Sequence, residues 1–249
     1  MNLEMFFDEY AEVAIAFSGG VDSAYLLYEA NKYARRVKAY YVKSQFQPQF
    51  EYEDALRFGS EIGVDIEVIN ANVLEVEDVI CNPSNRCYFC KRVIMSSILA
   101  KAREDGFHVL LDGTNASDDM NDRPGGKALE ELKILSPLRM CGLTKDVIRQ
   151  CSREAGLFTS EKPAYACLAT RIPTGMRITA ELLERTEEAE EFMMNLGFSD
   201  FRIRTRGENA LIQIRASQMD LFDISRQKIY DKLGTMYKEV QLDSKVRDE

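Results

Sequence analysis

The sequence predicts an α/β fold, with a parallel sheet that has helices on both faces and a small α+β domain at the carboxyl end. Short apolar runs alternate with helix-period segments through the first two-thirds of the chain, as βαβ units require. A glycine-rich turn joins the first apolar run directly to the first helical segment. After residue 179 the pattern changes to helix, paired strands, helix and strand, which predicts the added domain.

The first apolar runs are short and nearly continuous, as buried parallel strands are. The segments between them have helical periodicity, and Thr144 can serve as the N-cap of the last one. Two segments, 112–136 and 156–175, are rich in Gly, Pro, Asn and Asp and are expected to be loops. Strands are expected at residues 12–17, 37–42, 66–69 and 109–111, and helices at 23–33, 50–62, 87–104 and 144–155.

The last part of the chain has its own organisation. Apolar residues recur at helical spacing over 182–196, and 217–233 has a second helical pattern. Two alternating segments, 201–206 and 210–215, are joined through a Gly-Glu-Asn turn as in a hairpin, and 238–242 is a last strand. We therefore expect one domain over residues 1–176 and a second over 177–249.

Composition excludes several classes of protein. The net charge of −9 argues against broad nucleic-acid binding. No apolar run approaches the roughly 20 residues that span a membrane, and the acidic N-terminus lacks the basic region of a secretory signal, so we expect a cytoplasmic location and no membrane partner. The six cysteines are expected to be reduced, metal-binding or catalytic, and with a single histidine any metal site would be rich in thiolates.

The hexapeptide Ser18-Gly19-Gly20-Val21-Asp22-Ser23 is the strongest local signal. Glycines let the backbone turn tightly and approach a ligand, and the free amides of the following helix attract an anion. Asp22 would repel a bare phosphate, so we expect it to hold Mg²⁺ or to orient the loop. The segment is neither a Walker A loop nor a dinucleotide fingerprint, because the Gly-Lys-Ser/Thr and the third glycine are missing.

This hexapeptide resembles the PP-loop of the ATP pyrophosphatase superfamily. The resemblance implies an adenine nucleotide alpha hydrolase-like fold and cleavage of ATP between its α and β phosphates, with AMP transferred to a substrate oxygen. The loop amides would hold the departing pyrophosphate. The resemblance also implies that Ser44, after the second strand, lies near the adenine, and that Gly113 and Thr114 belong to the nucleotide site.

Three cysteines are candidates for chemistry. Cys87 and Cys90 form a C-x-x-C at the start of a predicted helix, where thiolate is favoured and two sulfurs can reach one ion. Alone, this motif leaves zinc, an iron–sulfur cluster, redox chemistry and chance all open. Cys167 lies in a loop between Lys162 and Arg171, whose charges would suit a thiolate. Of the others, Cys141 and Cys151 are expected in the core, while the role of Cys81 is undecided.

These motifs together resemble the LarE family, the ATP-dependent sulfur transferases of nickel-pincer nucleotide biosynthesis in lactate racemase maturation. The resemblance implies adenylation of the carboxylates of pyridinium-3,5-biscarboxylic acid mononucleotide and their conversion to thiocarboxylates. It also implies a homo-oligomer, a hexamer in this family. The segments that carry it are 18–23, Arg86–Lys91, Asp112–Asn115, Asp122–Gly125, Ser136–Leu138 and Ala166–Pro173.

The family contains two sulfur sources. In one subgroup a single cysteine gives up its sulfur, and in another three cysteines hold a 4Fe–4S cluster that relays sulfide. Cys87, Cys90 and Cys167 resemble the second arrangement, and Cys167 would also be the donor in the first. Sulfide or a cysteine desulfurase would reload the cluster. Arg171, one turn beyond Cys167, is expected in the catalytic loop.

Further candidates follow from the family and from residue type. Arg202 and Arg204 repeat every second residue on one predicted strand, so they share a side, and similar arginines bind the substrate phosphate. A solvated strand face is an equally good interpretation. Glu190 is expected on a helix surface rather than in a site, and Asp118, Asp119 and Asp122 form an acidic loop that could hold Mg²⁺.

Two alternative functions stay open. One is another adenylating enzyme of the superfamily, such as a tRNA or nucleoside thiolase or an amide-forming ligase. The other is a nucleotide-binding module that kept the loop and lost the chemistry. Asp22, Ser23 and Arg171 favour an active enzyme.

Overall fold

The computed structural model describes residues 1–119 and 124–247, so Asp122 lies outside the described residues. The chain forms two compact units, and each is described by itself. Unit 1 comprises Met1–Val73 and Asn85–Lys162, and unit 2 comprises Leu74–Ser84 and Pro163–Glu249. The expected domain boundary, between residues 176 and 177, lies within the sequence of unit 2.

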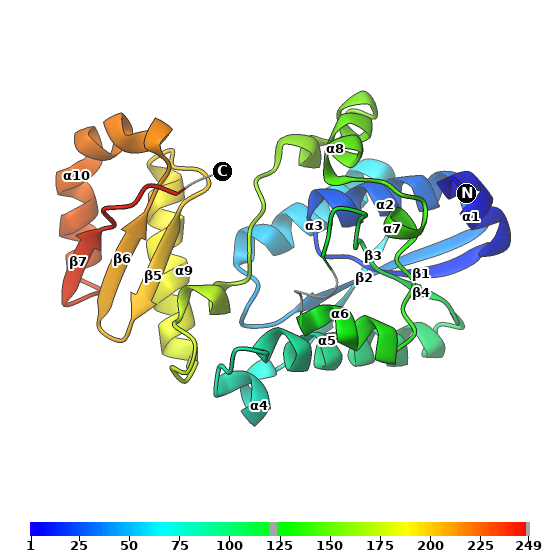
Figure 1. Cartoon of the computed structure of the whole chain (residues 1–249), viewed down its shortest axis with the longest axis horizontal. Coiled ribbons are helices and arrows are strands. Elements are labelled where there is room, and N and C mark those ends of the chain that lie inside the picture. The colour runs from blue at the N-terminus through cyan, green and yellow to red at the C-terminus, as the bar shows by residue number, and fades with distance from the viewer. Residues whose placement is uncertain (120–123, 248–249) are drawn as a thin grey trace. The chain divides into compact units, whose positions relative to one another are not determined.

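Unit 1 is built on a four-stranded parallel sheet with strand order β3-β2-β1-β4 (Figure 1). In its register Ile15 of β1 lies opposite Ala39 of β2 and Leu111 of β4. The predicted parallel sheet is confirmed, because every neighbouring pair of strands runs in the same direction. The strands are β1 (Glu12–Ala16), β2 (Arg36–Lys43), β3 (Ile66–Asn70) and β4 (Leu110–Leu111).

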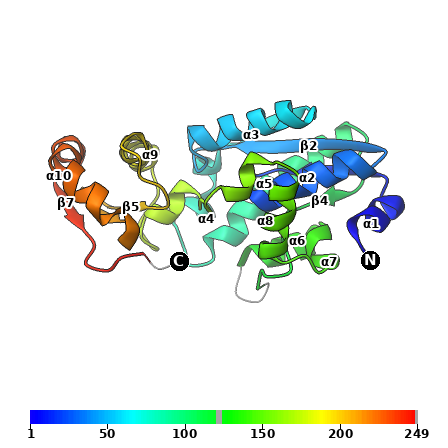
Figure 2. The same cartoon turned by 90° about the horizontal axis from the view of Figure 1, so that it is seen from above.

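Helices cover both faces of this sheet (Figures 1 and 2). Strand β1 shows why, because its side chains alternate between two separate cores. Val13 and Ile15 belong to the core shared with α2, α3 and α8, whereas Ala14 and Ala16 belong to the core shared with α5 and α6. The helices are α1 (Leu3–Glu9), α2 (Val21–Tyr33), α3 (Gln49–Ile62), α5 (Arg86–Glu104), α6 (Pro124–Glu131), α7 (Pro137–Met140) and α8 (Lys145–Glu154).

The expectation that 112–136 is entirely loop is wrong, because α6 lies within it. Proline and two glycines at its start conceal the helix in the sequence, although proline is well suited to the first turn of a helix. Ala128 and Leu129 are buried, and Leu129 joins the core on the α5 face of the sheet. A Cβ on Gly125 would lie 3.0 Å from Cδ of Lys91 on α5, so the glycine permits this close approach.

Unit 2 contains a three-stranded sheet in the order β5-β6-β7, with a β5–β6 hairpin and a parallel β6–β7 pair. Gly207 turns the hairpin with φ of 62°, as predicted from the sequence. Helices α9 and α10 cover one face (Figures 1 and 2), with Met193, Ile212 and Phe222 in the core between. The elements are α4 (Glu77–Ile80), α9 (Ala180–Asn195), β5 (Arg202–Arg206), β6 (Asn209–Gln213), α10 (Met219–Gly234) and β7 (Glu239–Leu242).

Short 3₁₀ helices complete the described residues, at Val73–Glu75, Phe158–Glu161, Leu168–Arg171 and Ala216–Gln218. The segment 74–84 joins unit 2 because the Ile178 amide donates to the Ile80 carbonyl at 2.8 Å, and buried Asn82 donates to the Pro173 carbonyl at 2.8 Å. None of the helices in the described ranges has the length and apolar character needed to cross a membrane.

Candidate active site

The glycine-rich loop connects β1 to α2 at the carboxyl edge of the sheet. Gly19 has φ of 77°, a conformation that favours glycine, and Gly20 is the N-cap of α2 without a side-chain cap. The Ser23 hydroxyl donates to the Gly20 carbonyl at 3.1 Å and accepts from the Ser18 amide at 3.2 Å. The loop is therefore closed by its own serines, while α2 has no capping side chain and keeps amides for an anion.

The turn after β4 packs against the backbone of this loop at the start of α2. Gly113 lies so close to α2 that a Cβ there would be 2.9 Å from the Ser23 amide nitrogen. Asp112 is buried and accepts from the hydroxyls of Thr114 and Ser136, each at 2.6 Å. Gly113 and Thr114, which were predicted to belong to the nucleotide site, thus follow a strand whose end lies against the loop. Only glycine at position 113 allows the two backbones to come this close.

Replacing Gly113 with alanine is expected to weaken ATP binding by about 10-fold or more, close to 1.4 kcal/mol. The new methyl group would collide with backbone rather than with a flexible side chain, so the first turn of α2 must shift. Isothermal titration calorimetry with ATP measures the effect. Gly234→Ala in α10 is the control, because a Cβ there meets nothing within 4 Å. Equal affinities for both variants would contradict the supporting role of the turn.

Asp22, the second residue of α2, is held by two partners from distant segments. Lys145 Nζ lies 2.6 Å from its Oδ2, and Asn115 Nδ2 donates to its Oδ1 at 3.2 Å. Neither partner was predicted for Asp22 from the sequence. The one available signal was Lys145 itself, a cation at the first position of a helix, where the dipole disfavours positive charge.

A second cation lies beside the loop. Lys162 Nζ is 3.5 Å from the Gly19 carbonyl and bridges Glu51 and Asp54 of α3, at 2.8 and 2.7 Å. Burial raises the pKa of Glu51, and the charge of Lys162 opposes that rise. Lys162 is thus engaged by two carboxylates of α3.

Ser44 stands where β2 ends, at the same edge of the sheet as the phosphate loop. It is buried, and its hydroxyl donates to Gln47 Oε1 at 2.6 Å while accepting from the Phe46 amide at 3.2 Å. These two bonds hold residues 44–47 in a turn at the carboxyl end of β2. The segment expected to contact the adenine is the one that follows this strand.

The C-x-x-C lies in the first two turns of α5. Cys87 is exposed and Cys90 is half-buried, and both are reduced. Residues three apart share a helix face, so both sulfurs can reach one ion. Lys91, the next residue, reaches Asp112 at 3.5 Å and so connects this helix to the turn under the phosphate loop. Within the described residues, no group of three or more His, Cys, Asp and Glu side chains is gathered as a metal site.

Cys167 lies in unit 2, immediately before the Leu168–Arg171 3₁₀ helix. Its carbonyl accepts from the amide and hydroxyl of Thr170, at 2.9 and 2.8 Å. The side chain of Arg171 is fully buried, and its guanidinium makes a two-pronged ion pair with Glu190 at 2.8 and 3.0 Å. A third bond, from Arg171 Nη1 to the Ala166 carbonyl at 2.9 Å, ties this pair to the cysteine loop.

Glu190 is not on a helix surface as expected, but is almost completely buried in unit 2. It also accepts from the Ile203 amide at 2.8 Å and from the Tyr165 hydroxyl. Burial lowers the pKa of Arg171, but pairing with Glu190 outweighs it and the net shift is upward. Lys162 and Arg171, the two cations expected to favour a Cys167 thiolate, are each paired with carboxylates, and Arg171 still interacts electrostatically with Cys167.

Arg202 and Arg204 lie on one side of β5, as their spacing predicts. Arg202 is buried, so a solvated strand face is wrong for it, and its Nη2 donates to the Ala164 carbonyl at 2.8 Å. Arg204 donates to the Thr170 carbonyl at 2.5 Å. Burial, then the charges of Arg171 and Arg247, lower the pKa of Arg202 to about 10 and also lower that of Arg204. Burial therefore disfavours the charged form of both guanidinium groups more than the neighbouring charges do.

Sequence similarity to known proteins identifies the family of this chain. No protein-family model matches it. An uncharacterised protein of Synechocystis sp. is 34% identical over 97% of this chain and 92% of its own length. An uncharacterised Methanocaldococcus jannaschii protein is 29% identical over 87% and 82%. The pyridinium-3,5-bisthiocarboxylic acid mononucleotide synthase of Lactiplantibacillus plantarum is 26% identical over 93% and 85%.

The chain belongs to the LarE family. Two tRNA-specific 2-thiouridylases of Thermotoga species are 26% identical over 61% of this chain and 54% of their own length, which places the LarE-family sheet in the wider PP-loop superfamily. The predicted family and fold are thereby confirmed. The chain is a member of a family of ATP-using sulfur-transfer enzymes.

Three further cysteines of this LarE-family chain have no predicted part in the chemistry: Cys81, Cys141 and Cys151. Cys141 and Cys151 are half-buried against the unit 1 core, in agreement with a packing role. Cys81 is exposed in unit 2, and its thiol donates to Glu77 Oε1 at 3.0 Å. That carboxylate raises the pKa of Cys81, which favours the thiol over the thiolate.

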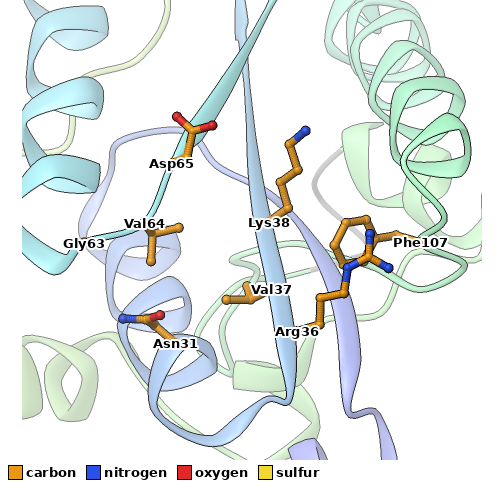
Figure 3. A pocket seen from close by; sticks show the side chains of 8 residues that line it. All are labelled: Asn31, Arg36, Val37, Lys38, Gly63, Val64, Asp65 and Phe107. Carbon is orange, nitrogen blue, oxygen red and sulfur yellow. The ribbon is translucent and has the colours of Figure 1, made fainter.

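A pocket of about 290 Å³ lies at the amino ends of the strands, away from the phosphate loop. It is formed where β2 begins and where residues 63–65 lead into β3 (Figure 3). The Arg36 guanidinium stacks 4.1 Å from the Phe107 ring centre and donates to the Asp105 carbonyl. Lys38 is paired with Glu67 and Asp105. In open α/β sheets ligands bind at the carboxyl ends of strands, so this pocket is not the nucleotide site.

Proposed function

We propose that the chain is an ATP-dependent sulfur transferase that adenylates the carboxylates of pyridinium-3,5-biscarboxylic acid mononucleotide and converts them to thiocarboxylates. The observation that carries the proposal is the phosphate loop with its Asp22 and supporting Gly113, in a chain 26% identical to a synthase of the bisthiocarboxylic product over 93% of its length.

Adenylation would use the residues of unit 1. The loop amides from Gly19 to Ser23 stabilise the negative charge that grows on pyrophosphate as it leaves. Asp22 would bind Mg²⁺, which supplies charge neutralisation on the phosphates when bound. The turn that begins at Ser44 would receive the adenine. AMP then remains on a carboxylate oxygen of the substrate as a good leaving group for sulfur attack.

Sulfur transfer would use Cys167 and the residues around it. Arg202 and Arg204 are proposed to bind the substrate phosphate, because they lie on one side of β5 and a guanidinium group can bind phosphate through paired N–H donors. Arg171 and Glu190 are too buried to touch substrate, and we assign them to holding the cysteine loop. Arg171 would then act as a positioning residue within the predicted catalytic loop.

We further propose that Cys87, Cys90 and Cys167 hold a 4Fe–4S cluster, which supplies sulfide when bound. One observation supports the fit of the first pair: Cys87 and Cys90 are one helical turn apart in α5. The third ligand belongs to the other unit. If the cluster is absent, Cys167 is the direct donor. Sulfide or a cysteine desulfurase is the proposed source of new sulfur, and a homo-oligomer is the proposed assembly.

Iron and acid-labile sulfide per chain are expected to be close to the four-to-four cluster ratio after anaerobic purification, and to be lost in Cys90→Ala. Removing one of three thiolates leaves too few ligands to hold the cluster. Cys151→Ala is the control, because this half-buried thiol packs in unit 1 away from α5. A carefully anaerobic protein without iron would overturn the cluster and leave Cys167 as a single-use donor; bound zinc would favour a nucleoside enzyme.

The overall function is tested by pyrophosphate release with ATP and the pyridinium biscarboxylate. Release that depends on this substrate, with a thiocarboxylate product, is the expected result. A tRNA thiolase is the second candidate, because 61% of the chain matches tRNA-specific 2-thiouridylases. Release stimulated by tRNA, with no response to the small substrate, would favour that function instead. Neither response would indicate a nucleotide-binding module.

A further inference from the structure

We propose that Lys145 is a phosphate-binding residue of the same site, which contacts the β- and γ-phosphates of ATP and stabilises the departing pyrophosphate. This inference rests on the proposed function and adds a catalytic residue to it. The starting point is the short contact of 2.6 Å between Lys145 Nζ and Asp22 Oδ2. Asp22 is the second residue of α2 and adjoins the amides that would hold the phosphates.

The ion pair is open enough to exchange partners. The side chains of Lys145 and Asp22 keep 32% and 22% of their exposure, so neither is sealed in the core. A lysine stem is long and flexible, and its ammonium group is a compact charge that binds phosphate well. The ammonium group can therefore move from the carboxylate to a neighbouring phosphate oxygen without being left unpaired.

The position of Lys145 in its own helix also points to a function outside that helix. It is the first residue of α8, directly after the N-cap Thr144, whose side chain accepts from the Val147 amide. A cation at this end of a helix opposes the helix dipole. The Lys145 amide donates to Ser117 Oγ at 3.1 Å, which fixes the backbone from which the side chain reaches Asp22. Residues that break a local rule in this way are expected at functional sites.

Electrostatics favour a cation at this place. The Asp22 carboxylate would repel a triphosphate when no Mg²⁺ is bound to it, and the ammonium group of Lys145 offsets that repulsion. Lys162, which lies near the Gly19 carbonyl, is already shared by Glu51 and Asp54. Among residues 1–119 and 124–247, by contrast, the carboxylate that pairs with Lys145 is Asp22, which belongs to the loop itself.

Pyrophosphate affinity is the direct test, measured by calorimetry on the full chain with Lys145→Met, Lys145→Arg and wild type. The methionine variant is expected to bind pyrophosphate at least about 10-fold more weakly, and the arginine variant to recover part of the loss. Arg153→Met is the matched control, because Arg153 lies at the other end of α8 in an exposed pair with Glu161. Its pyrophosphate affinity should equal that of wild type.

A second comparison separates phosphate binding from mere support of Asp22. If Lys145 only positions that carboxylate, Lys145→Met should have no further effect in an Asp22→Asn background. We expect a further loss of about 10-fold there, because the phosphate contact does not depend on the carboxylate. In steady-state pyrophosphate release, Lys145→Met should lower kcat as well as raise KM for ATP, since the contact strengthens as charge develops.

The outcomes distinguish this inference from the proposed function. Equal pyrophosphate affinity in wild type and Lys145→Met would overturn the role of Lys145, even if thiocarboxylate formation is observed. A wild-type chain that binds pyrophosphate through Lys145 but makes no thiocarboxylate would overturn the proposed reaction and leave the phosphate contact standing. Wild type that neither binds pyrophosphate nor makes thiocarboxylate would overturn both.

Discussion

Replacing Cys167 with alanine is expected to reduce thiocarboxylate formation by about 1,000-fold or more, while ATP-dependent pyrophosphate release continues. Both proposed sulfur routes pass through this thiol, whereas adenylation does not use sulfur. The loop should keep its shape, because the Cys167 carbonyl, not its sulfur, accepts from Thr170. Mass spectrometry of the nucleotide product and a pyrophosphate assay measure the two steps separately.

Cys141→Ala is the control for loss of a half-buried thiol, because Cys141 packs against the unit 1 core and has no proposed chemical role. Its product yield should match that of wild type. Thiocarboxylate formation at the wild-type rate by Cys167→Ala would exclude both the cluster ligand and the direct donor. Loss of pyrophosphate release together with product would instead show that Cys167 is needed before sulfur transfer.

Replacing Glu190 with glutamine is expected to destabilise unit 2 by about 3–5 kcal/mol. The substitution keeps the shape of the side chain but leaves the guanidinium of Arg171 charged, fully buried and without its counter-ion. Urea denaturation should show an early transition, and hydrogen exchange should assign it to α9 and β5 rather than to the sheet of unit 1. Arg171→Met should be comparably destabilising, and the double variant less so than the sum.

Arg177→Met provides the contrast within unit 2, because it also breaks an arginine–glutamate pair, with Glu77, but both side chains are more than half exposed. Exposed pairs contribute little to stability, so its urea midpoint should stay near that of wild type. If Glu190→Gln and Arg177→Met gave the same midpoint, burial of the Arg171–Glu190 pair would not be what holds the cysteine loop.

Periodicity and local motifs predicted most of the fold. The nearly continuous apolar run at 12–17 predicted a buried parallel strand, because every residue after Glu12 in it is apolar, and β1 indeed faces two cores. The serine and glycine residues of the phosphate loop predicted the turn that leads into α2. The helix α6 was missed, because Pro124, Gly125 and Gly126 signal a loop when the contact with α5 is unknown.

The sequence by itself determined the sheet, the phosphate loop, the cysteine motifs and the family to which they belong, because each depends on residues close together in the chain. Tertiary structure alone decided which charges meet. Asp22 and Lys145 are 123 positions apart, and Arg171 and Glu190 are separated by a turn and most of α9. A glutamate in a helical segment, such as Glu190, is expected to be solvent-exposed unless its tertiary contacts are known. The carboxylate that pairs with a lysine such as Lys145 likewise depends on the tertiary fold. Burial and charge pairing at long range are properties of the packed chain, so no local pattern could reveal them.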